Sequence, residues 1–220
     1  MCVLVACEES QRVCKAFRDK GHIAFSCDIE EPSGGHPEWH IKGDVIPLLN
    51  GCCEFTTMDG ELHSLDKKWD MIIAFPPCTY LTTAGACRLY PTKGVINPER
   101  YALGKDAATF FMAILNADCE KIVIENPTPM KVFELPRYNQ VIEPFMFGHP
   151  YKKRTCLWLK GVEPLEPTDM VTENIISWVG AGSKDRNGNP RKGKCTTFRD
   201  AKTRSKTFEG IAAAMAEQWG

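Results

Sequence analysis

The first candidate for a reactive residue is a cysteine that follows two prolines in the segment WDMIIAFPPCTYLTTAG, residues 69–85. Pro76 and Pro77 remove two backbone donors and stiffen the exit from an apolar run, which fixes the direction in which the Cys78 side chain points. A rigid exit of this kind suits a nucleophile. Most free cysteines are small buried hydrophobes, however, so the motif taken alone favours a structural thiol.

A carboxyl group stands at the end of another apolar run. Glu125 closes the run in KIVIENP, and a helix predicted from Pro98 to about Ala117 connects this run to the one before Cys78. One βαβ crossover places the two strand ends beside each other at one edge of a sheet. A carboxyl group and a thiol would then line one pocket. The alternative is that Glu125 only caps a loop.

Two earlier strand ends also carry polar groups. The predicted strand CVLVAC runs into Cys7-Glu8-Glu9-Ser10, and the predicted strand HIAFSCDIE has Asp28 at its end. Ligands of open α/β sheets bind outside the carboxyl ends of strands. An acid such as Asp28 occupies the position that binds ribose hydroxyls in nucleotide-binding folds of this class.

The elements that must position these groups alternate between strand and helix. Apolar residues at helical spacing follow the first strand: Val13, Ala16 and Phe17. Gly21 ends that helix, and Asp59-Gly60 between two alternating runs predicts a small hairpin before the strand at 71–75. A terminal helix is predicted in TFEGIAAAMAEQW. The fold class is therefore α/β with a mainly parallel sheet.

Composition narrows the class of protein. A length of 220 residues is typical of one large domain. Hydrophobic residues make up 43% of the chain, which is enough to form a core. Its eleven cysteines are an odd number and no signal-peptide pattern precedes them, which predicts reduced thiols in the cytoplasm. No apolar run is long enough for a membrane helix. Adjacent Cys52 and Cys53, with no C-x-x-C pair, argue against a metal site.

Charge is unevenly distributed along the chain. The formal net charge is -1, so an anionic partner would need a local patch. Residues 183–207 supply one, with nine Lys or Arg against two acids. This is where an anionic partner would bind.

Four motifs in order resemble those of DNA (cytosine-5)-methyltransferases, of the short form encoded by phages and mobile elements. FPPC resembles the Pro-Cys nucleophile motif of that family, and ENP resembles its Glu-Asn motif. FGHPYKKRTCLWLKG resembles the segment with a Gln-x-Arg-x-Arg pattern, and GDV at 43–45 resembles the loop whose acid meets the cofactor adenine. The order and spacing match across residues 1–160.

The resemblance implies a Rossmann-like methyltransferase fold, with helices on both faces of the sheet, and a mechanism. Cys78 as thiolate adds to carbon 6 of a flipped-out cytosine, and protonated Glu125 donates to ring nitrogen 3. Carbon 5 then takes a methyl group from S-adenosylmethionine. Arg154 corresponds to the first arginine of the family pattern and is the third implied catalytic residue, beside Cys78 and Glu125. The implied cofactor-binding residues are Cys7, Glu8, Ser10, Asp28, Asp44, Phe75 and Pro76.

It also implies double-stranded DNA as the partner, in a bacterial or phage-infected cell. Residues 1–160 would form the catalytic core, 161–206 a reduced target-recognition region, and 207–220 a helix that packs on the core. The predicted DNA-binding residues are Arg186, Arg191, Lys192, Lys194 and Arg199.

The chain departs from the family in two places. No glycine lies between Met1 and Lys20, where the family has a glycine-rich loop, and Lys152 and Cys156 replace the glutamine and the second arginine of the pattern. Three alternatives therefore stay open: a non-catalytic DNA-binding protein with the same fold, an enzyme that acts on cytosine nucleotides, and an enzyme that uses a variant of S-adenosylmethionine.

Overall fold

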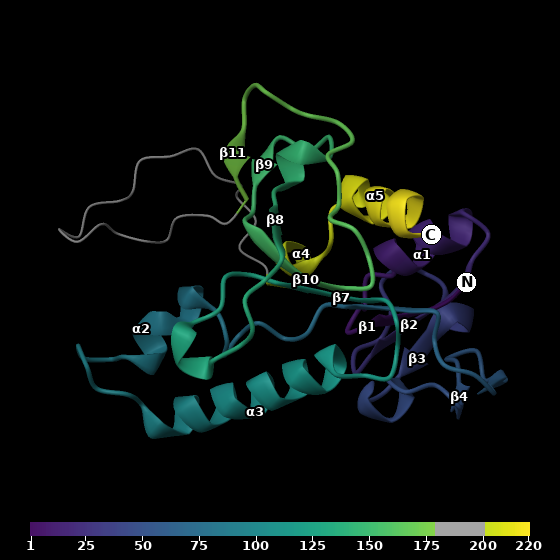
Figure 1. Ribbon diagram of the computed structural model, residues 1–220, viewed down its shortest axis with the longest axis horizontal. Helices are drawn as coiled ribbons and strands as arrows, with labels where there is room; N and C mark the ends of the chain where they lie inside the picture. Colours follow the sequence, from purple (N-terminus) through teal and green to yellow (C-terminus); the bar gives the residue numbers. More distant parts are fainter. Residues whose placement is uncertain (179–200) are drawn as a thin grey trace.

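A seven-stranded sheet forms the centre of the computed structural model, which describes residues 1–178 and 201–220 (Figure 1). The first five strands in the spatial order are parallel, and β10 runs antiparallel to both of its neighbours. The order across the sheet is β3 (His40–Lys42), β2 (Ile23–Asp28), β1 (Cys2–Ala6), β6 (Met71–Ala74), β7 (Ile122–Asn126), β10 (Thr155–Lys160) and β8 (Gln140–Ile142). The α/β class and the mainly parallel sheet predicted from sequence are confirmed.

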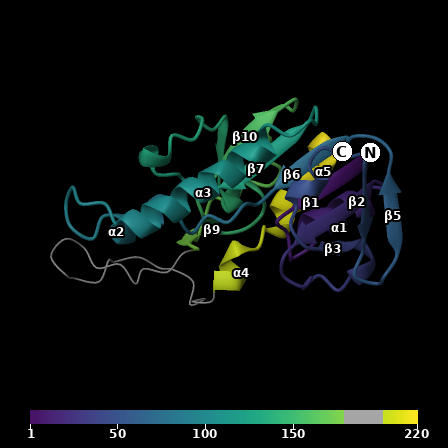
Figure 2. The ribbon, with the colours of Figure 1, turned by 90° about the horizontal axis from the view of Figure 1, so that it is seen from below.

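Helices cover both faces of this sheet. The helix α3 (Pro98–Leu115) lies on one face against β7, while α1 (Arg12–Asp19) and α5 (Glu209–Trp219) pack together on the other (Figures 1 and 2). Side chains of β1 alternate between the two layers, because successive residues of a strand point to opposite faces. Leu4 is buried in one cluster with Phe111 of α3, and Val3 in the other with Phe17 and Met215.

Helix boundaries follow the signals in the sequence. Asn97 caps α3 by accepting a hydrogen bond from the backbone N–H of Arg100 at 3.0 Å, and Pro98 occupies the first turn. Helix α1 ends at Asp19, and Gly21 follows with a positive φ of 85°. Both boundaries were predicted.

Smaller elements surround the sheet. The predicted hairpin is confirmed: β4 (Cys53–Thr56) and β5 (Leu62–Leu65) pair antiparallel around Asp59 and Gly60. A second pair is formed by β9 (Tyr151–Lys152) and β11 (Ile176–Ser177). The remaining helices are α2 (Ala86–Leu89), α4 (Ala201–Ser205) and the 3-10 turns Pro37–Trp39, Ile46–Leu48, Thr83–Gly85, Lys131–Phe133 and Pro144–Met146.

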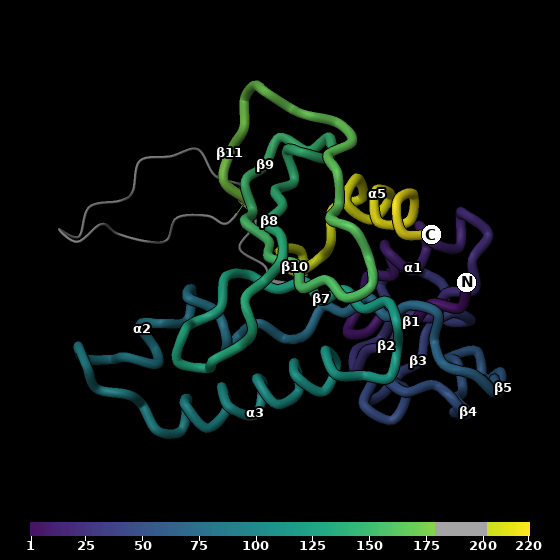
Figure 3. The backbone as a smooth tube through the Cα atoms, in the orientation of Figure 1, coloured from purple at the N-terminus to yellow at the C-terminus, as the bar shows by residue number. Residues whose placement is uncertain are grey.

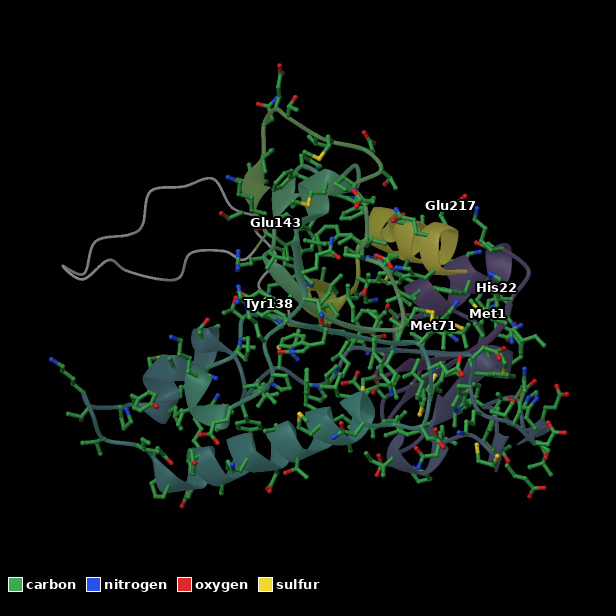
Figure 4. The ribbon with its side chains drawn as sticks, in the orientation of Figure 1. Met1, His22, Met71, Tyr138, Glu143 and Glu217 are labelled. Carbon is green, nitrogen blue, oxygen red and sulfur yellow. The ribbon has the colours of Figure 1, made fainter. Side chains whose placement is uncertain are left out.

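Segments from near both ends of the chain lie side by side (Figure 3). Lys20, just after α1, pairs with Glu217 of α5, and the amino group of Met1 lies 3.2 Å from Nδ1 of His22 (Figure 4). Within the described ranges, no helix has the length and apolar character needed to cross a membrane.

Candidate functional site

The parallel strands bring the predicted site residues to one edge of the sheet. In the register of β1, β6 and β7, Ala6 lies opposite Ala74, and Ala74 lies opposite Ile124. The residues after these three positions therefore lie at the same edge, where β1 and β6 end and β7 continues for two more residues that pair with β10. They include Cys7, Phe75 to Cys78, and Glu125 with Asn126.

The segment that carries Cys78 is held by its neighbour strand. The side-chain amide of Asn126, at the end of β7, donates a hydrogen bond to the backbone carbonyl of Pro76 at 3.1 Å. The carbonyl of Cys78 accepts from the backbone N–H groups of Leu81 and Thr82, both at 3.2 Å, so the chain turns directly after the thiol. Cys78 is thus fixed from both sides.

The Glu125 carboxylate acts electrostatically on the Cys78 thiol. Burial is the largest cause of a raised pKa of the Cys78 thiol, and the Glu125 carboxylate raises it further. Burial also raises the pKa of Glu125, against the opposing effects of Lys153 and a hydrogen bond with the Thr155 side chain. This effect is consistent with the expectation that a thiol and a carboxyl group share one site, which stays a prediction.

A lysine that sequence analysis did not single out belongs to the same group. Lys153 precedes β10 by two residues and lowers the pKa of both Cys78 and Glu125. It also lines a small pocket with Glu125, Thr155 and residues from the C-terminal segment, namely Thr207, Phe208, Ile211 and Met215. The basic run KKR was the available signal, but the family pattern directed attention to Arg154 instead.

Arg154 is exposed and bridges two loops. Its Nε donates to the Thr128 hydroxyl at 3.3 Å, and its Nη2 donates to the Tyr138 hydroxyl at 3.2 Å (Figure 4). Cys156, which replaces the second arginine of the family pattern, is fully buried and lies opposite Asn126 in the sheet. Arg154 therefore lies close to the end of β7, and its assigned role in chemistry stays a prediction.

The loop between β1 and α1 makes its turns without glycine. Cys7 and Gln11 adopt left-handed backbone conformations, with φ of 58° and 57°. Such values are uncommon for residues that carry a Cβ. Gln11 is held there because its amide donates to the Ser26 hydroxyl and to the His36 carbonyl, at 3.2 and 2.8 Å. The absence of glycine thus does not prevent a tight loop.

The carboxylate of Glu8, in this loop, is hydrogen-bonded to other groups of the protein. Its buried carboxylate accepts hydrogen bonds from the backbone N–H groups of Val13 and Cys14, at 2.7 and 3.1 Å, and from the Ser10 hydroxyl at 3.4 Å. These contacts cap the first turn of α1. Burial raises the pKa of Glu8 to about 7, against these hydrogen bonds. Glu8 and Ser10 thus hold α1, and a cofactor contact by either stays a prediction.

Asp28 and Asp44 gather near Cys7. Each carboxylate uses Oδ1 to accept a nearby backbone N–H at 3.0 Å, Asp28 from Glu30 and Asp44 from Ile46. Burial raises the pKa of Cys7, and both aspartates add to this effect. Phe75 donates its backbone N–H to the carbonyl of Ala6 at 2.9 Å, so the chain leaves β6 at the level where it leaves β1. The predicted cofactor residues thus come from adjacent strand ends.

The described residues that flank positions 179–200 lie near this edge. Trp178 donates its backbone N–H to the carbonyl of Lys152 at 2.9 Å, and Lys202 of α4 pairs with Glu30 at 2.9 Å. Lys202 and Lys206 also lie 3.8 and 3.9 Å from Glu9. The predicted DNA-binding residues lie outside the described residues: Arg186, Arg191, Lys192, Lys194 and Arg199.

Comparison with known proteins adds no assignment, because no protein-family model matches the chain and no curated protein matches it.

Proposed function

We propose that the protein is a Rossmann-like methyltransferase that transfers a methyl group from S-adenosylmethionine to carbon 5 of cytosine in DNA. One observation carries this proposal: Cys78 follows β6, Glu125 lies near the end of the adjacent parallel strand β7 at the same edge of the sheet, and the Glu125 carboxylate acts electrostatically on Cys78. Attack on a ring carbon requires a thiolate, and activation of the ring requires a proton donor beside it. The site contains one of each.

Support for the cofactor comes from the ends of β1 and β2. Asp28 lies where acids bind ribose hydroxyls in nucleotide-binding α/β folds. Asp28 and Asp44 both act on Cys7, so the two carboxylates converge on one place. They present acceptors to the hydroxyl and amino groups of an adenosine. When bound, S-adenosylmethionine supplies an electrophilic methyl group.

The residues of the chain perform the remaining steps. The Cys78 sulfur forms a bond to carbon 6, while Glu125 holds a proton at nitrogen 3 and so lets electron density reach carbon 5. Loss of the proton from carbon 5, after it has gained the methyl group, breaks the bond between sulfur and carbon 6 and returns the thiolate. The raised pKa of Glu125 supports this role, because it increases the protonated fraction near neutral pH.

Trapping of the covalent adduct tests the proposal. Fluorine at carbon 5 blocks the final elimination, so duplex DNA that contains 5-fluorocytosine should form a denaturant-stable complex with the protein when S-adenosylmethionine is present. We expect Cys78→Ala to abolish this complex on a denaturing gel. Cys87→Ala is the matched control, because Cys87 is an exposed free thiol in the same region of the chain and should leave the complex unchanged.

Formation of the same complex by Cys78→Ala would assign the nucleophile to another residue. No complex with any variant, in a folded protein that binds DNA, would favour a non-catalytic DNA-binding protein.

A further inference from the structure

We propose that Arg100, in the first turn of α3, is a positioning residue of the candidate site, whose guanidinium group holds the turn that begins at Cys78. This turn covers residues 78–82, because the carbonyl of Cys78 accepts the backbone N–H groups of Leu81 and Thr82. We call it the Cys78 turn. The inference rests on the proposed role of Cys78 as nucleophile. It gives the helix that connects β6 to β7 a second task, which is to hold the nucleophile.

Two contacts join Arg100 to the residues directly after Cys78. Its Nη2 donates a hydrogen bond to the backbone carbonyl of Thr79 at 2.7 Å. A hydrogen bond from a charged donor is stronger than a neutral one. The Cζ of Arg100 lies 4.8 Å from the centre of the Tyr80 ring, a distance at which a cation is attracted to the face of an aromatic ring. One side chain thus holds two consecutive residues of the Cys78 turn.

A glycine leaves room for this guanidinium group. Gly85 is buried, and a Cβ at this position would lie 3.0 Å from Nη2 of Arg100 and 3.2 Å from the carbonyl oxygen of Thr79. Both distances are shorter than ordinary contacts of a Cβ. A side chain at position 85 would therefore push the guanidinium group away from Thr79.

The start of α3 fixes the base of the Arg100 side chain. The backbone N–H of Arg100 donates to the side chain of Asn97 at 3.0 Å. Asn97 in turn donates its backbone N–H to the carbonyl of Leu89, a buried residue of α2, at 2.8 Å. The start of α3 and α2 lie side by side (Figures 1 and 2). The guanidinium group therefore extends from a fixed point toward the loop.

Other parts of the protein hold the residues on either side of this contact. The side-chain amide of Asn126 donates to the carbonyl of Pro76 at 3.1 Å, and the backbone N–H of Met130 donates to the carbonyl of Leu81 at 2.7 Å. Both anchors belong to β7 or to the loop after it. Arg100 contacts the residues between them. Loss of its side chain should therefore loosen the Cys78 turn while both flanks stay in place.

Alkylation of the thiol measures how firmly the turn is held. Cys78 is partly buried, so iodoacetamide reacts faster when the turn opens; the thiolate forms a sulfur–carbon bond and iodide leaves. The full chain, without DNA or cofactor, would be alkylated, and the peptides of Cys78, Cys52 and Cys119 quantified by mass spectrometry. Exposed Cys52 reports the rate of the chemistry itself, and buried Cys119 reports opening of the whole molecule.

We expect Arg100→Met to raise the alkylation rate of Cys78 about tenfold relative to Cys119, because loss of a charged hydrogen bond increases the open fraction of the turn. Arg100→Lys keeps the charge but not the planar fork, and should give a smaller increase. Gly85→Ala should raise the rate with Arg100 still present. Arg88→Met is the matched control, because Arg88 is an exposed residue of the neighbouring α2, and it should leave the rate unchanged.

The same loosening should slow the proposed reaction. We expect Arg100→Met to form the fluorocytosine complex about tenfold to a hundredfold more slowly, since a displacement of a reacting group by about 1 Å is costly. The thiol would thus become more reactive toward a small reagent and less reactive toward DNA. A change in the intrinsic reactivity of the thiol would instead move both rates in one direction.

An unchanged Cys78 alkylation rate in folded Arg100→Met would overturn the proposal, as would an unchanged rate of complex formation. Equal increases at Cys78 and Cys119 would overturn it too, because they would show a loss of overall stability, and so would an equal increase in Arg88→Met. If Arg100→Met unfolds, Gly85→Ala decides by the same criteria. Alkylation needs no methyl transfer, so a raised Cys78 rate, with no fluorocytosine complex from the unmodified chain, would remove the proposed function and retain the hold of Arg100 on the turn.

Discussion

Two neighbouring carboxylates, Glu8 and Glu9, differ in what surrounds them. Glu8 is buried and accepts backbone N–H groups at the start of α1. Glu9 instead faces Lys202 and Lys206, at 3.8 and 3.9 Å. The sequence shows only two consecutive glutamates and does not reveal this difference in surroundings. The difference depends on which way the loop turns at Cys7, where φ is positive. Glu8 is thus a structural carboxylate within a loop predicted to bind a ligand.

Glu8 should make stability depend on pH. Burial raises its pKa from the ordinary 4.5 of an unfolded chain to about 7, so the folded protein binds more protons between these values. The contribution of Glu8 is therefore fully present below pH 4.5 and is lost as pH rises through 7, a change of about 1 to 3 kcal/mol. We expect Glu8→Gln to flatten the fall in unfolding free energy between pH 5 and pH 8, as measured by urea denaturation.

Glu54→Gln is the control for this measurement, because Glu54 is exposed on β4. Its pH dependence should match that of the unmodified chain. A Glu8→Gln variant with the same slope as the unmodified chain would show that Glu8 is ionised throughout this range.

Most of the strands and helices could be predicted, because their patterns are local. The buried runs of β1, β2, β6 and β7 and the capped start of α3 are visible in the sequence. The direction of β10 is not visible in the sequence, because the segment TCLWL is equally compatible with a parallel and an antiparallel strand. The place of Lys153 at the site depends on β10 returning against β7, which is a second reason, beside the family pattern that favoured Arg154, why Lys153 was missed. Cys78 and Glu125 could be paired because a crossover between parallel strands determines their proximity.

A substitution of Asp28, at the end of β2, is expected to weaken binding of the cofactor. Asp28 would accept hydrogen bonds from ribose hydroxyls, and charge-assisted bonds contribute about 1.5 to 3 kcal/mol. We expect Asp28→Ala to weaken S-adenosylmethionine binding about tenfold or more, as measured by calorimetry. Asp66→Ala, in the exposed segment after β5, should bind as the unmodified chain does. Equal affinity in folded Asp28→Ala would remove this residue from the site.

The described residues on either side of positions 179–200 lie near the candidate site. The chain leaves the described part at Trp178, next to Lys152, and returns at α4, where Lys202 pairs with Glu30. Both junctions thus lie near the ends of the strands that carry the candidate site.

The salt dependence of DNA binding tests this arrangement. Each lysine or arginine that contacts a phosphate releases counterions, which contributes about 0.9 to the slope of log affinity against log salt. Neutralising Arg191, Lys192 and Lys194 together should flatten the slope by about 2 to 3 units. Binding to all sequences should weaken alike, because phosphate contacts carry no base information. Fluorescence anisotropy over a salt series would measure both effects, and an unaltered slope would remove the segment from the DNA interface.

The pairing of α1 with α5 also bears on how the chain folds. Lys20 and Glu217 meet although 197 positions separate them along the chain. Closing so long a loop costs only slightly more entropy than closing one of half the length, because this term grows with the logarithm of loop length. Contacts between distant segments do slow folding, however. We therefore expect the parallel strands to assemble before Phe17 and Met215 are covered, so that this face of the sheet is the last to exclude water.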